Sequence, residues 1–129
     1  MSARNAAKPS VFDAAMGRVA EAEKQTGLKP LKMSVPKKET LKAVDDKDGA
    51  TYEGKKNAKG LKDGFGVKQW ADGAMYVGMW KNDQANGKGW LFHADGDIYG
   101  GDWVNDKASG QGTYLHVDGA KYVGAWLND

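Results

Sequence analysis

The sequence contains no cysteine, which excludes a disulfide framework, a thiol nucleophile and thiolate ligands for zinc or an iron–sulfur cluster. Long apolar runs are also missing, so we expect neither a membrane-spanning helix nor a secretory signal. Neither sign of charge predominates, because 19 basic and 17 acidic residues leave a formal net charge of only +2. The whole-molecule field therefore predicts no binding to nucleic acid or membrane. A length of 129 residues suits one small domain, or a smaller one with an arm.

Proline and glycine divide the chain into two parts of different composition. All three prolines and a net charge of +3 fall in residues 1–48. Residues 49–129 hold 16 of the 18 glycines, all five tryptophans and all five tyrosines, and their net charge is −1. We therefore expect a basic N-terminal part followed by a domain of a different kind.

A period of 23 residues runs through the second part, and such a period indicates a repeat architecture. Tyrosine, glycine and tryptophan recur in one register, together with a Gly-x-Gly motif and an Asp-Gly pair. An earlier copy begins near Asp48, one residue out of step because residues 59–62 carry an insertion. The structural repeat positions are Tyr76, Gly78, Trp80, Gly87, Gly89, Tyr99, Gly101, Trp103, Gly110 and Gly112.

Within each copy the residues alternate with period two, which predicts strands rather than helices. Tyr76, Gly78 and Trp80 share one face of such a strand. We expect the Asp-Gly pairs to form tight hairpin turns, and residues 81–86 to form a longer turn at the opposite end. Glycine inside a strand marks a close approach, so we expect aromatic rings of adjacent strands to lie over its backbone. A lone hairpin is marginally stable, so the copies must stack into one sheet.

The unit from Tyr76 to Trp80, with its Gly-x-Gly and Asp-Gly motifs, and the unit that begins at Tyr99 resemble MORN (membrane occupation and recognition nexus) repeats. The resemblance covers about residues 48–129, as three copies and a terminal half copy. It implies an all-β fold, an elongated, single-layer antiparallel sheet of stacked hairpins. The family often has a histidine before the first glycine of Gly-x-Gly. In this chain Asp63, Asn86 and Ser109 stand at that position, so the resemblance implies no role for such a histidine here.

Residues 1–28 contain a short amphipathic helix, which we expect at about residues 11–26. Ser10 is the expected N-cap, with Asp13 completing a capping box, and Gly27 is placed to end the helix. The narrow apolar stripe of this helix must dock against something. Three surfaces remain open for it: the chain's own sheet, a partner protein and a membrane.

Residues 29–47, the basic arm, contain two prolines and no helical period, which is typical of an extended linker that is disordered when alone. We expect the basic arm to lie along a neighbouring molecule. The alternative is that it rests on the chain's own sheet. The candidate partner-binding residues of the N-terminal part are Phe12, Met16, Lys29, Lys32, Lys37, Lys38 and Lys42.

Residues 122–126 form the first strand of a further copy, and no return strand follows them in the sequence. We therefore expect an edge strand with unpaired N–H and C=O groups and no proline to block it. Such an edge accepts a strand from a partner protein or from a second copy of the chain. The alternative is that the natural chain continues past Asp129. The candidate edge residues are Tyr122, Val123, Gly124 and Trp126.

We predict no catalytic residue, no cofactor site and no metal site. His93 and His116 lie 23 residues apart and so share one position in the sheet, which explains them without a metal or catalytic role. The Gly-x-Gly motifs lack the following Lys-Ser/Thr of a phosphate-binding loop. Nucleic acid is not an expected partner, because residues 49–129 are net negative and the sheet needs their aromatic rings.

We therefore expect a non-enzymatic scaffold that binds other proteins of a multi-subunit assembly. The family resemblance implies cytoskeletal settings, including cilia and radial spokes, and membrane-associated ones. We expect a cytoplasmic, cytoskeletal and axonemal location, with tubulin, a second MORN protein or a second copy as partner. We prefer this setting to a membrane because the mildly acidic sheet lacks the basic patch that anionic lipids attract. One alternative is a peripheral membrane tether that binds anionic phospholipids through the basic arm. The other is an accessory subunit of a mitochondrial complex, since residues 1–12 hold two basic residues and no acidic one.

Overall fold

The computed structural model describes residues 9–127. Within these residues, eight strands form one open antiparallel sheet, in which each strand pairs with the next in sequence. This confirms the predicted all-β sheet of stacked hairpins. The strands are β1 (Ala43–Asp45), β2 (Thr51–Lys56), β3 (Lys62–Gln69), β4 (Met75–Lys81), β5 (Gln84–Phe92), β6 (Ile98–Val104), β7 (Lys107–Leu115) and β8 (Lys121–Trp126). Two short 3₁₀ helices, η2 (Lys38–Thr40) and η3 (Lys47–Gly49), flank β1.

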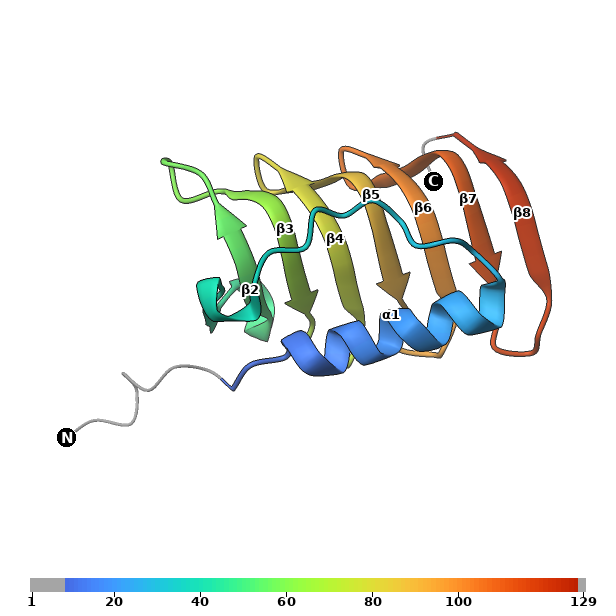
Figure 1. Ribbon diagram of the computed structural model, residues 1–129, viewed down its shortest axis with the longest axis horizontal. Coiled ribbons are helices and arrows are strands. Elements are labelled where there is room, and N and C mark those ends of the chain that lie inside the picture. The colour runs from blue at the N-terminus through green and yellow to red at the C-terminus, as the bar shows by residue number, and fades with distance from the viewer. Residues whose placement is uncertain (1–8, 128–129) are drawn as a thin grey trace.

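A second layer covers one face of the sheet. The helix α1 (Phe12–Thr26) crosses the strands along this face, and the chain then runs back across the same face toward β1 (Figure 1). We call this side the helix face. The tyrosines and tryptophans of the repeat lie on the opposite side, which we call the aromatic face.

The hydrophobic core lies between the helix layer and the sheet. Ala15 and Ala22 of α1 are fully buried, and their small side chains let the helix approach the strands closely. The buried core residues are Ala15, Val19, Ala22, Met33, Phe65, Val67, Met75, Val77, Trp90 and Phe92. Phe12 and Met16 pack against the same cluster and are partly buried. The apolar stripe of the helix therefore docks on the chain's own sheet, one of the three surfaces that the sequence left open.

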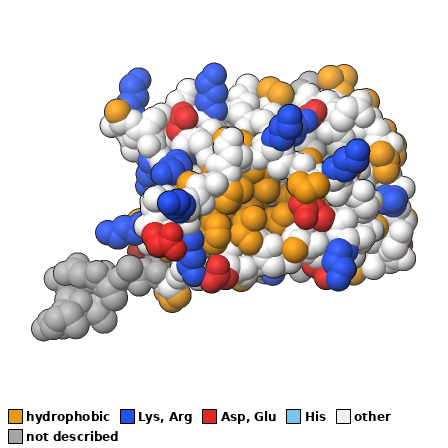
Figure 2. All heavy atoms as spheres, viewed as in Figure 1, with side chains coloured by type: hydrophobic (Ala, Val, Ile, Leu, Met, Phe, Trp, Pro, Cys, Tyr) orange, Lys and Arg blue, Asp and Glu red, His pale blue; other side chains and the backbone are white. Residues whose placement is uncertain are grey.

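The basic arm also lies on the chain's own sheet. Leu31 and Leu41 pack against the core on either side of the buried Met33, while the lysines between them are exposed. Hydrophobic side chains thus gather in the middle of the helix face, and Lys and Arg side chains surround them (Figure 2). We expected the arm to lie along a neighbouring molecule. The structure shows the alternative arrangement, because these apolar residues give the arm an anchor within its own chain.

The two ends of α1 are fixed in different ways. Glycine at the C-terminal end behaves as predicted: Gly27 has a left-handed φ of 74° and donates its N–H to Glu23 O at 2.9 Å. The N-terminal prediction is wrong, because Val11 occupies the N-cap position. The Ser10 hydroxyl and the Val11 N–H both donate to the buried carboxylate of Glu53 in β2, at 2.8 Å each. The sheet, rather than a local capping box, therefore closes this end of the helix.

The two kinds of hairpin connection have the reverse of their predicted lengths. Between β4 and β5 only Asn82 and Asp83 intervene, and both have positive φ, 49° and 70°. Asparagine and aspartate tolerate this conformation, so they form the tight two-residue turn. The Asp-Gly pair lies instead in a five-residue loop, residues 70–74, in which Gly73 alone has positive φ. The N–H of Trp70 closes this loop by donating to Ala74 O at 2.9 Å.

The two glycines of each Gly-x-Gly motif have separate roles. Gly87 lies in a bulge, in which three residues of β5 lie opposite a single residue of β4, Met79. Its φ of 100° is the positive backbone angle that this bulge needs. Gly89 has ordinary strand geometry, but a Cβ atom there would overlap the ring and hydroxyl of Tyr76. The same overlap occurs between Gly66 and Tyr52 and between Gly112 and Tyr99. The predicted passage of rings over bare glycine backbone is confirmed.

Replacing Gly89 with alanine is expected to lower the free energy of unfolding by at least about 2 kcal/mol, because the Tyr76 ring must leave its place. Urea denaturation measures this loss. The matched control is Gly17→Ala in the exposed part of α1, where a Cβ meets nothing within 4 Å. That change should stabilise the protein by about 0.5–1 kcal/mol. Equal effects of the two substitutions would contradict the packing account.

Candidate functional site

The aromatic face carries a continuous ladder of edge-to-face ring contacts. Tyr76 packs against Trp80 of its own strand, with ring centroids 5.0 Å apart, and against Trp103 of β6, at 5.3 Å. The same pair of contacts recurs at Tyr99, with Trp103 and Trp126, at 5.2 Å each. Tyr76 and Tyr99 thus each join two successive tryptophans, and the ladder links one repeat to the next.

The polar atoms of the ladder are satisfied by backbone carbonyls. The Tyr76 hydroxyl donates to Met79 O at 3.0 Å, and the Trp103 indole N–H donates to Gly89 O at 3.1 Å. Burial raises the pKa of the Tyr76 phenol well above its ordinary value and raises that of Tyr99 to about 12. These hydroxyls therefore stay protonated at neutral pH and act as structural donors.

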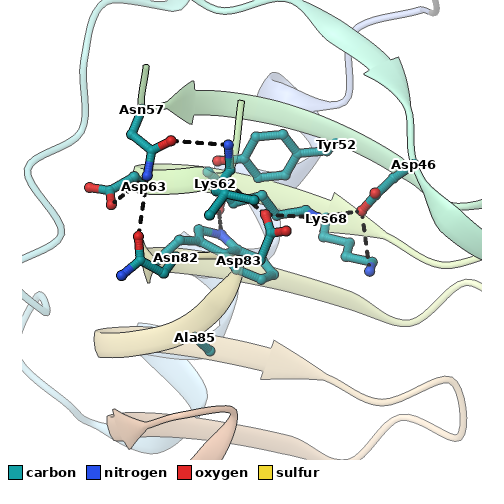
Figure 3. A network of polar contacts seen from close by, with 12 residues as sticks. Asp46, Tyr52, Asn57, Lys62, Asp63, Lys68, Asn82, Asp83 and Ala85 are labelled. Carbon is teal, nitrogen blue, oxygen red and sulfur yellow. Dashed lines mark hydrogen bonds and ion pairs between the residues drawn. The ribbon is translucent and has the colours of Figure 1, made fainter. Parts of the chain in front are cut away.

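A buried lysine interrupts the aromatic face in the first copy. Lys62 is 7% exposed, and its ammonium lies 5.3 Å from the centroid of the Tyr52 ring and 5.6 Å from that of the Trp80 ring. It forms ion pairs with Asp46 at 2.9 Å and with Asp83 at 3.8 Å (Figure 3). Two rings and two carboxylates thus surround one cation, which offsets the cost of burying its charge.

Asp46 anchors this network from the N-terminal side of the sheet. It also accepts an ion pair from Lys68 at 3.2 Å. Partial burial raises the pKa of Asp46, but hydrogen bonds from Lys62, from the Lys47 backbone and from Lys68 outweigh burial and lower it to about 2. The carboxylate is therefore ionised throughout the physiological range.

A pocket of about 430 Å³ opens on the aromatic face between Trp80 and Trp103. Ala85, the second residue of β5, lies in its wall. Three carboxylates and two further aromatic rings also line the pocket. Its other lining residues are Lys68, Trp70, Asp72, Ala74, Tyr76, Asp83, Leu91 and Asp106.

The predicted edge strand is present. Within the described residues, β8 pairs with β7 alone and lies at the end of the sheet. Tyr122 and Val123 are 50% and 64% exposed. Gly124 and Trp126 are partly buried; Trp126 completes the ring ladder through Tyr99 and Tyr122. The structure thus brings together the four candidate edge residues, and their contact with a partner stays a prediction.

The candidate residues of the N-terminal part are distributed differently. Phe12 and Met16 face the sheet as part of the core. Lys29, Lys32, Lys37, Lys38 and Lys42 are exposed. Lys38 forms an ion pair with Asp13 at 2.6 Å, which ties the basic arm to α1. The two apolar residues therefore stabilise the fold, and the contact of the lysines with a partner stays a prediction.

The histidines lie at equivalent positions, as their spacing predicted, but in loops between strands rather than in the sheet itself. His93 and His116 each donate the backbone N–H that closes a five-residue loop, and both rings pack against Tyr114. Within residues 9–127, no group of three histidine and acidic side chains is arranged to hold a metal ion. The helix in this part of the chain is too short and too polar to cross a membrane.

The Lys62 network and the pocket beside it were not predicted from the sequence. A signal was present, because Lys62 occupies the position that alanine takes 23 and 46 residues later, at Ala85 and Ala108. A lysine that replaces a buried alanine of a repeat indicates a locally different environment. The acidic partner at position 46 precedes the first recognisable copy, so nothing in the repeat pattern pointed to it.

The contacts described above define the class of the protein: an open sheet of stacked β-hairpins held by a repeating tyrosine, tryptophan and glycine arrangement. A family model for the MORN repeat matches residues 58–75, 76–98 and 99–121. The chain is a member of the MORN repeat family. Such repeats generally serve as protein- or membrane-binding scaffolding modules and are non-catalytic. A search of curated proteins finds no match to the chain.

Removing the Asp46 charge should make the stability less dependent on acid pH. In the unfolded chain this carboxyl binds a proton near pH 4, whereas in the folded protein it does so only near pH 2. Ionised Asp46 therefore adds stability above about pH 4, and this stability is lost as the pH falls to about 2. Asp46→Asn should cost about 1–2 kcal/mol at pH 6 and almost nothing at pH 2.

Urea denaturation of the wild type and of Asp46→Asn at several pH values measures this difference. Asp118→Asn is the control, because its carboxylate is exposed and accepts only a local hydrogen bond from the Ala120 N–H. A constant difference between the wild type and Asp46→Asn across the acid range would contradict the ion-pair account.

Proposed function

We propose that this protein is a non-enzymatic scaffold that binds other proteins, with the open edge of β8 as a principal contact. The observation that carries the proposal is the exposed apolar surface at this end of the sheet. Of the large hydrophobic side chains that are exposed in residues 9–127, all but Val35 lie in or near β6 to β8. They are Val104, Val117, Tyr122, Val123 and Leu127. Apolar surface gathered beside an unpaired strand is typical of a binding site for another chain.

The backbone of β8 is oriented to accept a further strand. His116 N–H donates to Ala120 O at 2.8 Å, so these two residues form a hydrogen-bonded pair. Hydrogen-bonded and non-hydrogen-bonded pairs alternate along an antiparallel ladder. Lys121, Val123 and Ala125 therefore direct their N–H and C=O groups away from β7 and toward the open edge. A partner strand finds both backbone groups and exposed apolar side chains there.

For the setting we propose a cytoskeletal assembly, with a ciliary or axonemal location as the first one to test. This rests on the family resemblance and on the absence of a basic patch from the sheet sequence, which weakens attraction to anionic lipid. Tubulin, a second MORN protein or a second copy of the chain are the partners to examine. Fluorescent tagging in a ciliated cell tests the location, and a label excluded from cilia would contradict it.

A peripheral membrane tether is the second candidate, because the basic arm exposes its lysines on the helix face. Co-sedimentation with phosphatidylserine vesicles, at low and high salt, tests it. The full chain and a charge-removed variant with Lys29, Lys32, Lys37 and Lys42 changed to glutamine form the matched pair. Salt-sensitive binding that the variant loses would favour the membrane, and equal sedimentation of the two proteins would contradict it.

The scaffold proposal is tested by a photo-crosslinking amino acid placed at position 122 in the full chain. Tyr122 is half exposed on β8. In native extract, we expect discrete crosslinked protein species from this position. Position 59, in the loop between β2 and β3 at the other end of the sheet, is an exposed control. Crosslinks from neither position, or equal diffuse labelling from both, would contradict a specific contact at the edge.

Val123→Pro should reduce the crosslinking yield at position 122 about fivefold to tenfold. Proline removes an N–H that points toward the open edge, and its ring obstructs the incoming strand. The pairing of β8 with β7 does not use that N–H, so the remaining sheet should stay folded by circular dichroism. Val123→Ala keeps the N–H and is the matched control. A yield unaffected by the proline would contradict strand addition at β8.

A further inference from the structure

We propose that the pocket between Trp80 and Trp103 binds a lysine side chain of a partner protein. This inference rests on the proposed scaffold function and names the chemistry by which one partner is recognised. It comes from a comparison of this pocket with the equivalent place one repeat earlier. There, the chain's own Lys62 fills the site.

The first copy shows what the site can hold. The Lys62 ammonium lies against the rings of Tyr52 and Trp80, at 5.3 and 5.6 Å from their centroids, and within 3.8 Å of the Asp83 carboxylate. Asp83 also fixes the backbone, because its Oδ1 accepts the Lys62 N–H at 2.7 Å and its own N–H donates to Lys62 O at 3.0 Å. The lysine side chain is therefore held by cation–π contacts and by two carboxylates, Asp83 and, at 2.9 Å, Asp46, while the reciprocal clamp fixes its backbone.

The next copy repeats the two rings, the Asp83-type carboxylate and the backbone clamp of this site, but it has neither the lysine nor the Asp46 carboxylate. Ala85 stands at the position of Lys62 and makes the same clamp, with Asp106 Oδ1 at 2.7 Å from Ala85 N and Asp106 N at 3.0 Å from Ala85 O. The remaining equivalences follow from the strand pairing. Tyr76 replaces Tyr52, Trp103 replaces Trp80, Asp106 replaces Asp83 and Trp70 replaces Asp46.

The small side chain of Ala85 leaves the volume of the lysine open. Figure 3 shows Ala85 below the Lys62 network. This space is part of the pocket of about 430 Å³. Tyr76 and Leu91 are among the residues that line it. An unbranched aliphatic chain that ends in a charged group fits a site lined by apolar and ring surface together with carboxylates.

The charges around the pocket favour a cation. Its carboxylates are Asp72, Asp83 and Asp106, and its one basic residue is Lys68. The Lys68 ammonium is already engaged by Asp46, at 3.2 Å, and by the Trp70 ring, at 5.1 Å. Within residues 9–127, no lysine or arginine forms an ion pair with Asp106, which is exposed. Asp106 is therefore the carboxylate that an incoming ammonium meets, as Lys62 meets Asp83.

The test uses the full chain and two short peptides, acetyl-Gly-Gly-Lys-Gly-Gly-amide and its norleucine counterpart. Norleucine has the same aliphatic chain without the ammonium. The probe signals are the indole N–H resonances of Trp80 and Trp103 in NMR titrations, since both groups border the pocket and are fixed to Gly66 O and Gly89 O. We expect the lysine peptide to bind at least tenfold more tightly than the norleucine peptide.

Ala85→Lys is the decisive variant, because it should place an internal lysine where the first copy has Lys62. We expect it to weaken binding of the lysine peptide at the Trp103 signal at least tenfold. Ala108→Lys is the matched control: it adds the same side chain one repeat further on, leaves this pocket open and should keep the wild-type affinity. Asp106→Asn retains the acceptor for the Ala85 N–H and loses only the charge, so it should weaken binding severalfold. Thermal unfolding checks that each variant is folded.

Several results would overturn the proposal. They are equal affinity for the lysine and norleucine peptides, no titration of either indole signal, or undiminished binding by a folded Ala85→Lys variant. A trimethyllysine peptide that binds tenfold more tightly than the unmodified one would reassign the pocket to methylated lysine. If the lysine peptide does not bind but crosslinks still form at position 122, the lysine-pocket proposal is wrong and the scaffold proposal stands. If the lysine peptide binds but no crosslinks form at position 122, the scaffold proposal alone is contradicted.

Discussion

The structure depends on one contact, the passage of a tyrosine ring across the backbone of a glycine in the next strand. At Gly89 a single Cβ atom would overlap the Tyr76 ring, so the contact requires the absence of a side chain. Once in place, the tyrosine meets two tryptophans, one in its own strand and one in the next hairpin. Because the same contact recurs in every copy, a hairpin that is marginal alone becomes one unit of a stable array.

The two faces of the sheet have different roles. On the helix face, α1 and the basic arm bury the aliphatic side chains and leave basic groups outside. On the aromatic face, the repeat creates a row of equivalent positions beside each tryptophan. The first of these positions holds Lys62, and the next holds Ala85 with an open pocket. A substitution at a single repeat position thus separates a closed structural site from an open one.

Much of the fold could be predicted from the sequence, because the 23-residue period and the two-residue alternation report the sheet directly. The faces of Tyr76 and Trp80 and the edge position of β8 followed from them. The turns were assigned in reverse, since Asn82 and Asp83 tolerate positive φ without glycine and a repeat pattern does not show which connection is shorter. The Glu53 cap and the Asp46–Lys62 pair could not be predicted, because they join segments outside the repeat to the sheet through tertiary contacts alone.

The central claim is tested most directly by nuclear Overhauser effects between the aromatic protons of Tyr76 and the Hα protons of Gly89 in the full-length protein. The ring contact predicts strong cross-peaks for this pair, and equivalent ones between Tyr52 and Gly66 and between Tyr99 and Gly112. Absence of these cross-peaks in a protein whose β4–β5 pairing is intact would contradict the account, because the sheet would then be held without the rings.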